Sequence, residues 1–196
     1  MDELLRRLEA WLRENCPDYL AQLLPGLSDA EYSRFTEQLG VSPPDSFRAL
    51  YQWRNGQSPR SSDSLQHNMQ FAGAASILES KEVLDELQEG GEFEDANWWS
   101  PAWLPFLSNG GGDHLCVDMA GSFTGGVGQV LTFWHDDNPR TIRYPSLETW
   151  LECFISSLER GEWEVQGGDV QPRDYDAWTE YLSQHVPGYP VSAEAG

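Results

Sequence analysis

The sequence predicts an α+β fold in which a largely antiparallel or mixed sheet is flanked by helices. Helical patterns come first along the chain, strand-like segments with one inserted helix follow, and further helices come last. The centre of the pattern is residues 110–137, which are typical of a β-hairpin with a Gly-rich connection and a Trp-His-Asp-Asp exit. Residues 129–134 are apolar on both faces, which predicts a strand inside the sheet rather than at its edge.

Helical periodicity predicts most elements outside this hairpin. Residues 2–15 form an amphipathic pattern, and Ser28 with Glu31 has the spacing of a capping box at the start of a second helix. Ser42 is expected to cap a third helix that reaches Trp53. Further helices are predicted over residues 81–88, 147–160 and about 172–184.

The strand predictions concern shorter segments. Residues 113–119 and 129–134 are the two strands of the hairpin, and residues 103–106 are expected to join the same sheet. Ile77 and Leu78 suggest one more short strand. Residues 141–144 suggest another after the hairpin.

The C-terminal part of the sequence has a different composition. Residues 161–171 are polar and contain a Gly-Gly pair, which predicts a linker, and the tail from Pro187 is expected to fray. We therefore divide the chain into a domain over residues 1–160, which includes the N-terminal helices, and a C-terminal helical appendage with its tail over residues 161–196.

Charge is the strongest global feature of the 196-residue chain. The formal net charge is −20, with 32 Asp and Glu against 12 Lys and Arg. Repulsion argues against unaided binding to nucleic acid or to an anionic membrane, and the charge suits a basic protein partner or simply a well-solvated surface. Three scattered cysteines form no metal or disulfide motif, and no signal peptide or membrane span is evident. We therefore expect a cytoplasmic location.

The sequence predicts one cluster of side chains suited to catalysis or metal binding. If the hairpin pairs as predicted, Asp113, His114, His135 and Asp136 lie together at the strand ends far from the turn. Such a cluster could bind a divalent metal, or its Asp-His pair could activate the serine of a hydrolase. No spacing here matches a metal or hydrolase motif, and the glycines lack a phosphate-loop lysine. We therefore expect no catalytic residue, metal or cofactor, and keep a hydrolase or metal-dependent enzyme as an alternative.

An acidic segment precedes the hairpin. Residues 79–95 hold eight acidic residues and one lysine, and Trp98 and Trp99 follow closely. One interpretation is a solvated face followed by core tryptophans. The other is a partner-binding surface. Under the second interpretation the contact residues are Glu92, Glu94, Asp95, Trp98 and Trp99.

Several stretches, in the same order, resemble the signatures of the SUKH superfamily, and more narrowly its Smi/Knr cell-wall-regulator branch. The closing stretch, residues 144–151 with the sequence YPSLETWL, is similar to that family's last element. The other stretches are LYQWRNGQ at 50–57, WLPF at 103–106, GGDHLCVD at 111–118, GQVL at 128–131 and FWHDD at 133–137.

The resemblance implies an α+β fold and a non-enzymatic binding protein. Many bacterial members are immunity proteins that neutralise a toxin by direct binding, and fungal members are regulators that link cell-wall synthesis to signalling. Our leading hypothesis is an immunity protein with a cognate, basic toxin as its partner. A regulatory or scaffolding adaptor is the alternative. The family's groove would be carried by Trp53, Asp113, His114, Asp118, Trp134 and Asp136, with Asp137 beside them.

Overall fold

The computed structural model describes residues 1–93, 95, 97–123 and 125–193, and it confirms the α+β fold. None of the helices in these residues is long and apolar enough to cross a bilayer. The helices are α1 (Asp2–Asn15), α2 (Pro17–Gln22), α3 (Asp29–Leu39), α4 (Asp45–Trp53), α5 (Ala74–Glu89), α6 (Leu147–Glu159) and α7 (Tyr175–His185).

The main sheet is antiparallel throughout, and it contains the predicted hairpin. Its strand order is β10-β7-β6-β5-β4-β3. In the hairpin, His114 lies opposite Phe133 and Asp118 opposite Gln129. The expected interior position of the second hairpin strand is confirmed. The strands are β3 (Gln70–Phe71), β4 (Trp103–Ser108), β5 (His114–Asp118), β6 (Gln129–Phe133), β7 (Arg140–Tyr144) and β10 (Val191–Ala193).

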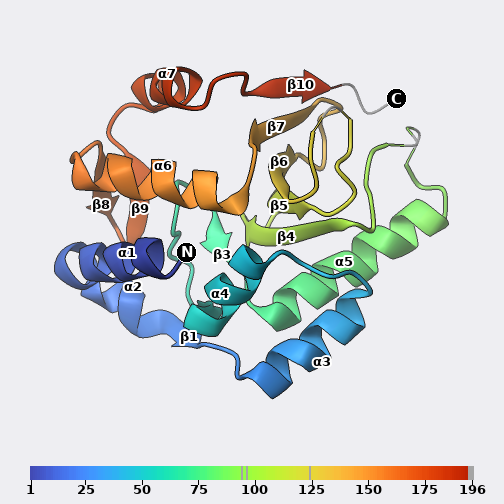
Figure 1. The fold of residues 1–196 in the computed structure, drawn as a ribbon, viewed down its shortest axis with the longest axis horizontal. Coiled ribbons are helices and arrows are strands. Elements are labelled where there is room, and N and C mark those ends of the chain that lie inside the picture. The colour runs from blue at the N-terminus through green and yellow to red at the C-terminus, as the bar shows by residue number, and fades with distance from the viewer. Residues whose placement is uncertain (94, 96, 124, 194–196) are drawn as a thin grey trace.

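Apolar side chains cover both faces of this sheet. On one face, Val117 and Val130 belong to the large core formed with the N-terminal helices and α6. On the other face, Leu131 and Phe133 pack with Trp99 and with Leu84 of α5. Figure 1 shows α6 beside α1 on one side of the molecule and α5 running below β4. Because successive side chains of a strand point to opposite faces, neighbouring hairpin residues pack in two different cores.

The prediction of a short strand at Ile77 and Leu78 is wrong, because both residues lie inside α5. The helix begins seven residues before Lys81, at Ala74, whose backbone N–H donates to the side chain of Asn55 at 2.8 Å. Ala74, Ile77, Lys81 and Leu84 then share the buried face at helical spacing. A hydrogen bond from a distant residue thus starts this helix earlier than the local sequence pattern predicts.

The C-terminal segment is more ordered than its composition predicts. The expected linker is a hairpin of β8 (Trp163–Gln166) and β9 (Asp169–Pro172), whose turn glycines 167 and 168 have positive φ. The tail expected to fray contains β10, which pairs with β7 at the sheet edge (Figure 1). Trp163 and Trp178 lie in the same large core as α1. The domain boundary near residue 160 stays a prediction.

Smaller differences concern helix ends and short elements. The third predicted helix begins at Asp45 with Pro44 at the capping position, and not at Ser42. The last begins at Tyr175, because Asp174 caps it by accepting from the backbone of Ala177. Neither α2 nor the pair of strands β1 (Leu23–Pro25) and β2 (Arg54–Gln57) was predicted from the sequence.

Candidate functional site

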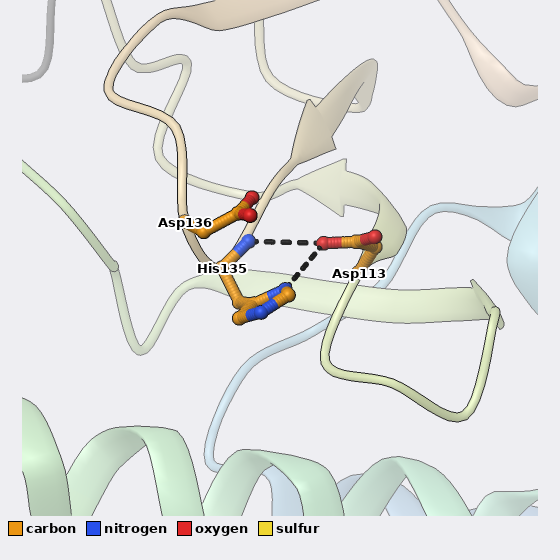
Figure 2. Close-up of side chains that lie close together, drawn as sticks. All are labelled: Asp113, His135 and Asp136. Atoms are coloured by element: carbon orange, nitrogen blue, oxygen red, sulfur yellow. Dashed lines mark hydrogen bonds and ion pairs between the residues drawn. The ribbon is translucent and has the colours of Figure 1, made fainter.

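The pairing of β5 with β6 brings the acidic exit of the hairpin to one end of the main sheet. Because His114 lies opposite Phe133, the residues just outside that pair meet across the strand ends. The expected meeting of Asp113, His135 and Asp136 is confirmed (Figure 2). We call this end of the sheet the acidic rim, and define it by Asp95, Asp113, His135, Asp136 and Asp137.

Asp113 and His135 form the centre of the acidic rim. One oxygen of the Asp113 carboxylate accepts from the backbone N–H of His135 at 3.0 Å and contacts its ring Nδ1 at 2.8 Å (Figure 2). The other oxygen accepts from the Asn109 side chain at 2.6 Å. These contacts fix the carboxylate between the two strand ends, although the imidazole itself is half-exposed.

The two side chains shift each other's pKa. The hydrogen bond to Asp113 raises the pKa of His135 above its ordinary value, and the charge of Asp136 adds to the effect. Partial burial works to raise the pKa of Asp113, but hydrogen bonds from His135 and Asn109 outweigh it and hold that pKa below its usual value. The pair therefore favours the charged form of both groups.

His114 is adjacent in sequence but has a different environment. Its ring is 5% exposed and stacks on Phe133 at 6.0 Å between centroids. Burial lowers the pKa of His114 to about 4, so the ring is neutral near pH 7. Its Nδ1 has no hydrogen-bond partner among the described residues. The structure thus places His114 beneath the acidic rim rather than on it.

Arg140 attaches the acidic segment to the sheet. Its side chain is fully buried between the rings of Trp98 and Phe133, with the guanidinium carbon 4.7 Å from each centroid. Its Nε and Nη2 donate to the carbonyl of Trp98 at 3.0 and 2.9 Å, and Nη1 donates to the carbonyls of Asp137 and Asn138. Burial lowers the pKa of Arg140 to about 10, so it remains a cation. The Asn138 side chain also donates to Asp95.

Other predicted contact residues lie away from the acidic rim. The Asp118 carboxylate is fully buried at the opposite end of β5, where it accepts from the backbone of Ala120 and Ser122 and the side chain of Gln129. Trp53 is on α4 and donates to Glu9 of α1 at 2.8 Å. Asp118 and Trp53 therefore contact other parts of the fold and not the acidic rim.

The remaining predicted contacts divide between core and surface. Trp99 is 2% exposed and donates to Asp85 of α5, so it is a core residue. Trp98 and Trp134 are half-buried, and Glu92 is exposed after the end of α5. Glu94 lies outside the described residues. The structure therefore gathers Asp95, Trp98, Asp113, Asp136 and Asp137 at one end of the sheet, with His114 beneath them. The Trp134 side chain instead packs against the large core on the other face of the sheet.

The cluster of Asp113, His135 and Asp136 has three candidate ligand atoms within 4.8 Å of one another. Oxygen and imidazole donors of this kind would suit a divalent metal. In the structure, however, one oxygen of Asp113 contacts His135 and the other accepts from Asn109, so Asp113 would have to exchange one of these contacts for the ion. This donor set is weaker than a preformed metal centre, and its carboxylates serve equally as acceptors for basic side chains.

The Asp113–His135 pair does not contact a serine or cysteine nucleophile among the described residues. Within the described ranges, no serine or cysteine hydrogen bonds to His135. Ser122 binds Trp103 and Asp118 at the other end of the sheet. Cys16 and Cys153 are buried, which raises the pKa of each thiol to about 11, and burial raises that of Cys116 further. A triad of the kind required for acyl transfer is therefore not assembled in the part of the chain that the structure describes.

Most basic side chains are already engaged, so the acid surplus dominates the surface. Arg140 and Lys81 are buried on carbonyls of the chain, the latter also near Asp85. The exposed and half-buried ion pairs are Arg6–Glu3, Arg7–Glu159, Arg13–Glu9, Arg48–Asp29, Arg54–Glu9, Arg160–Glu162 and Arg173–Glu164. Such pairs contribute little stability each, but they cancel the positive charge locally.

Sequence reasoning missed the role of Arg140 and Asn138. No motif marks either residue, and a lone arginine in a strand is usually exposed. The available signal was the position of Arg140 near the Trp-rich segment in a chain with only one lysine, since buried arginine commonly stacks on aromatic rings.

The central part of the chain matches a known family. A model of the SMI1/KNR4 family (SUKH-1) matches residues 26–153, which include the central hairpin and most of α6. The match ends before β8, β9, α7 and β10.

Individual relatives are fungal proteins of low identity. The cell wall assembly regulator SMI1 of Saccharomyces cerevisiae is 32% identical over 63 residues, which are 32% of this chain and 12% of that protein. The KNR4/SMI1 homolog 2 of Debaryomyces hansenii is 22% identical over 86% of this chain and 37% of its own length. The cell wall biosynthesis/cell cycle regulator smi1 of Schizosaccharomyces pombe is 20% identical over 86% of this chain and 38% of its own. The chain thus spans well under half the length of these curated relatives.

Proposed function

This chain belongs to the SMI1/KNR4 family (SUKH-1), and on that premise we propose that it is a non-enzymatic binding protein that recognises a basic protein partner through the acidic rim. The observation that carries the proposal is the combination of a net charge of −20 with carboxylates gathered at one end of the sheet. Complementary charge speeds encounter between proteins, and half-buried aromatic residues beside it provide the contacts that slow dissociation.

The acidic rim has the parts that such an interface requires. Asp136 and Asp137 are exposed, and Trp98 beside them is half-buried. Arg140 holds the backbone of Trp98 and of Asp137 in fixed positions, so the surface is organised before a partner arrives. Preorganisation of this kind reduces the entropy lost on binding.

The leading form of the proposal is an immunity protein. A toxin that acts on nucleic acid carries basic surface to hold phosphates, and an acidic inhibitor would meet it rapidly. Simple occlusion of the toxin would be sufficient, so no catalytic group is needed.

The second form is a regulatory adaptor, and the names of the relatives favour it. They are described as regulators of cell-wall assembly or biosynthesis, and the whole of each relative is much longer than this chain. An adaptor would bind its partner without suppressing the partner's activity. It would also bind several proteins more weakly than an inhibitor binds one.

The experiment that tests the proposal is affinity capture of this chain from its native cell, at low salt and at roughly half-molar salt to screen exposed charge. One stoichiometric basic partner, released by salt, is the expected result. Adding the protein to the purified partner then separates the two forms, because an immunity protein abolishes the partner's activity at a one-to-one ratio. Recovery of only acidic partners, insensitive to salt, would contradict the proposal.

A further inference from the structure

A hollow of about 80 Å³ opens where the C-terminal segment meets the main sheet. The sheet contributes residues of β5, β6 and β7, and the opposite walls come from β8, α7 and the loop at residues 66–69. Five aromatic side chains line it, namely Trp134, Tyr144, Trp163, Tyr175 and Trp178. A mostly aromatic, concave surface with a few polar groups is typical of a site for a small ligand.

The charge of the hollow is the opposite of that of the protein. Among the described residues, no aspartate or glutamate lines it, although the chain has 32 of them, whereas Arg143 and His67 do. The Arg143 side chain makes no hydrogen bond or ion pair with any residue that the structure describes. In a chain whose other arginines are mostly paired, this leaves a guanidinium fork available to an anion.

A second donor, in the wall opposite the sheet, also lacks an acceptor. Trp163 is 3% exposed, and its Nε1 has no partner among the described residues. The lining therefore supplies two unpaired donors, the Arg143 guanidinium and the Trp163 Nε1. The described lining residues include no carboxylate, so a cationic ligand would contact aromatic rings without a counter-charge and would be repelled by Arg143.

The aromatic walls are held rigidly. Trp163 makes edge contacts with Phe154 and Trp178, at centroid distances of 5.0 and 5.3 Å. At the mouth, His67 has the unusual φ of 57°, is held by a hydrogen bond from its N–H to the carbonyl of Val170 at 2.7 Å, and lies 5.4 Å from the Tyr175 ring. A non-glycine residue keeps such a φ only where its surroundings enforce it.

We propose that this hollow binds a small aromatic carboxylate, with its ring among Trp134, Tyr175 and Trp178 and its carboxylate on Arg143. The volume of about 80 Å³ is below the roughly 150 Å³ of an engineered cavity that holds benzene, so the open hollow takes at most one ring and is too small for a nucleotide. The single free guanidinium suits one negative charge. Three of the wall residues, Trp163, Tyr175 and Trp178, lie beyond the part of the chain that matches the family, so the site depends on the C-terminal segment.

The test uses the whole chain and three probes of equal ring size: benzoate, benzyl alcohol and benzylammonium. Saturation-transfer NMR at pH 7 and tryptophan fluorescence report binding. Benzoate should bind, benzyl alcohol more weakly, and benzylammonium least. Arg143→Gln should weaken benzoate by about tenfold or more, because charge-assisted hydrogen bonds are lost, and should leave benzyl alcohol unchanged.

The matched control is Arg60→Gln, since Arg60 is exposed in a loop and does not line the hollow. Tyr175→Ala, which removes a ring that is 47% exposed at the mouth, should weaken both benzoate and benzyl alcohol. Circular dichroism confirms that each variant is folded. Equal binding of the three probes, equal benzoate affinity of wild type and Arg143→Gln, or no binding of benzoate at millimolar concentration would overturn the proposal.

Discussion

Arg140 donates two hydrogen bonds to the carbonyl of Trp98 while its guanidinium lies 4.7 Å from the centroid of the same residue's ring. One side chain thus holds both the backbone and the indole of Trp98. Through its contacts to the carbonyls of Asp137 and Asn138, it also joins the acidic segment to the β6–β7 connection. The shape of the acidic rim depends on this buried cation.

Replacing Arg140 with Met should destabilise the protein. Three backbone carbonyls lose their donors, and we expect a loss of about 3 kcal/mol in the free energy of unfolding, measured by urea denaturation. Hydrogen exchange should rise at Asp95 and Trp98. Arg140→Lys keeps the charge but not the fork, and should be intermediate. A variant Arg140→Met within about 0.5 kcal/mol of wild type would show that the anchoring role is wrong.

His114 should make stability depend on pH. Its folded pKa of about 4 is below the unfolded value near 6.5, so the unfolded state binds more protons between these values. Stability should therefore fall as the pH falls from 6.5 towards 4, by up to roughly 3 kcal/mol from this residue.

His114→Phe keeps the stacking on Phe133 and should remove the contribution of His114 to the pH dependence of stability. The measurement is urea unfolding at a series of pH values. His185→Asn, on the exposed side of α7, is the control. Identical slopes for wild type and His114→Phe would contradict the burial of a neutral imidazole.

His135 should titrate above its ordinary value, because the Asp113 carboxylate stabilises its charged form. Asp113→Asn should lower the midpoint of the His135 titration, followed by NMR of the imidazole protons. Asp137→Asn is the control, since Asp137 does not contribute to the shift. For a basic partner, protonation of His135 adds a positive charge to the acidic rim, so association should weaken as the pH falls through that midpoint. A midpoint unchanged by Asp113→Asn would exclude the pair as its cause.

Asp118 should matter for folding rather than for partner binding. Its buried carboxylate accepts from two backbone N–H groups, the hydroxyl of Ser122 and the amide of Gln129. Asp118→Ala should cost about 3 kcal/mol of stability, because it leaves these donors unpaired. Glu37→Ala, at an exposed position of α3, should cost almost nothing. If the Asp118→Ala variant were as stable as wild type but bound the partner more weakly, Asp118 would belong to the contact surface.

The hairpin was predictable because its signals are local. Alternating apolar residues and clustered glycines indicate two strands and their connection, and the pairing then brings Asp113 to His135. The start of α5 was not predictable, because the side chain that caps Ala74 belongs to Asn55, far back in the chain. The pairing of β10 with β7 joins residues about fifty positions apart and has no local signal.

The candidate site was predictable in part for the same reason. Residues that flank the hairpin strands meet as expected, whereas the burial of Asp118, Trp99 and Arg140 depends on tertiary contacts. An acidic residue at a strand end has the same sequence signature whether it faces a partner or accepts backbone N–H groups, as Asp118 does. Composition alone does not distinguish these cases.

The most direct test of partner recognition at the acidic rim is the partner's dissociation constant for two charge-matched variants. Asp136→Lys with Asp137→Lys reverses two exposed carboxylates of the acidic rim, and Glu14→Lys with Glu37→Lys reverses two exposed carboxylates on α1 and α3. Both change the net charge equally. The proposal predicts at least about a tenfold weaker affinity for the rim variant and near wild-type affinity for the other. Equal affinity of the two variants for the captured partner would contradict it.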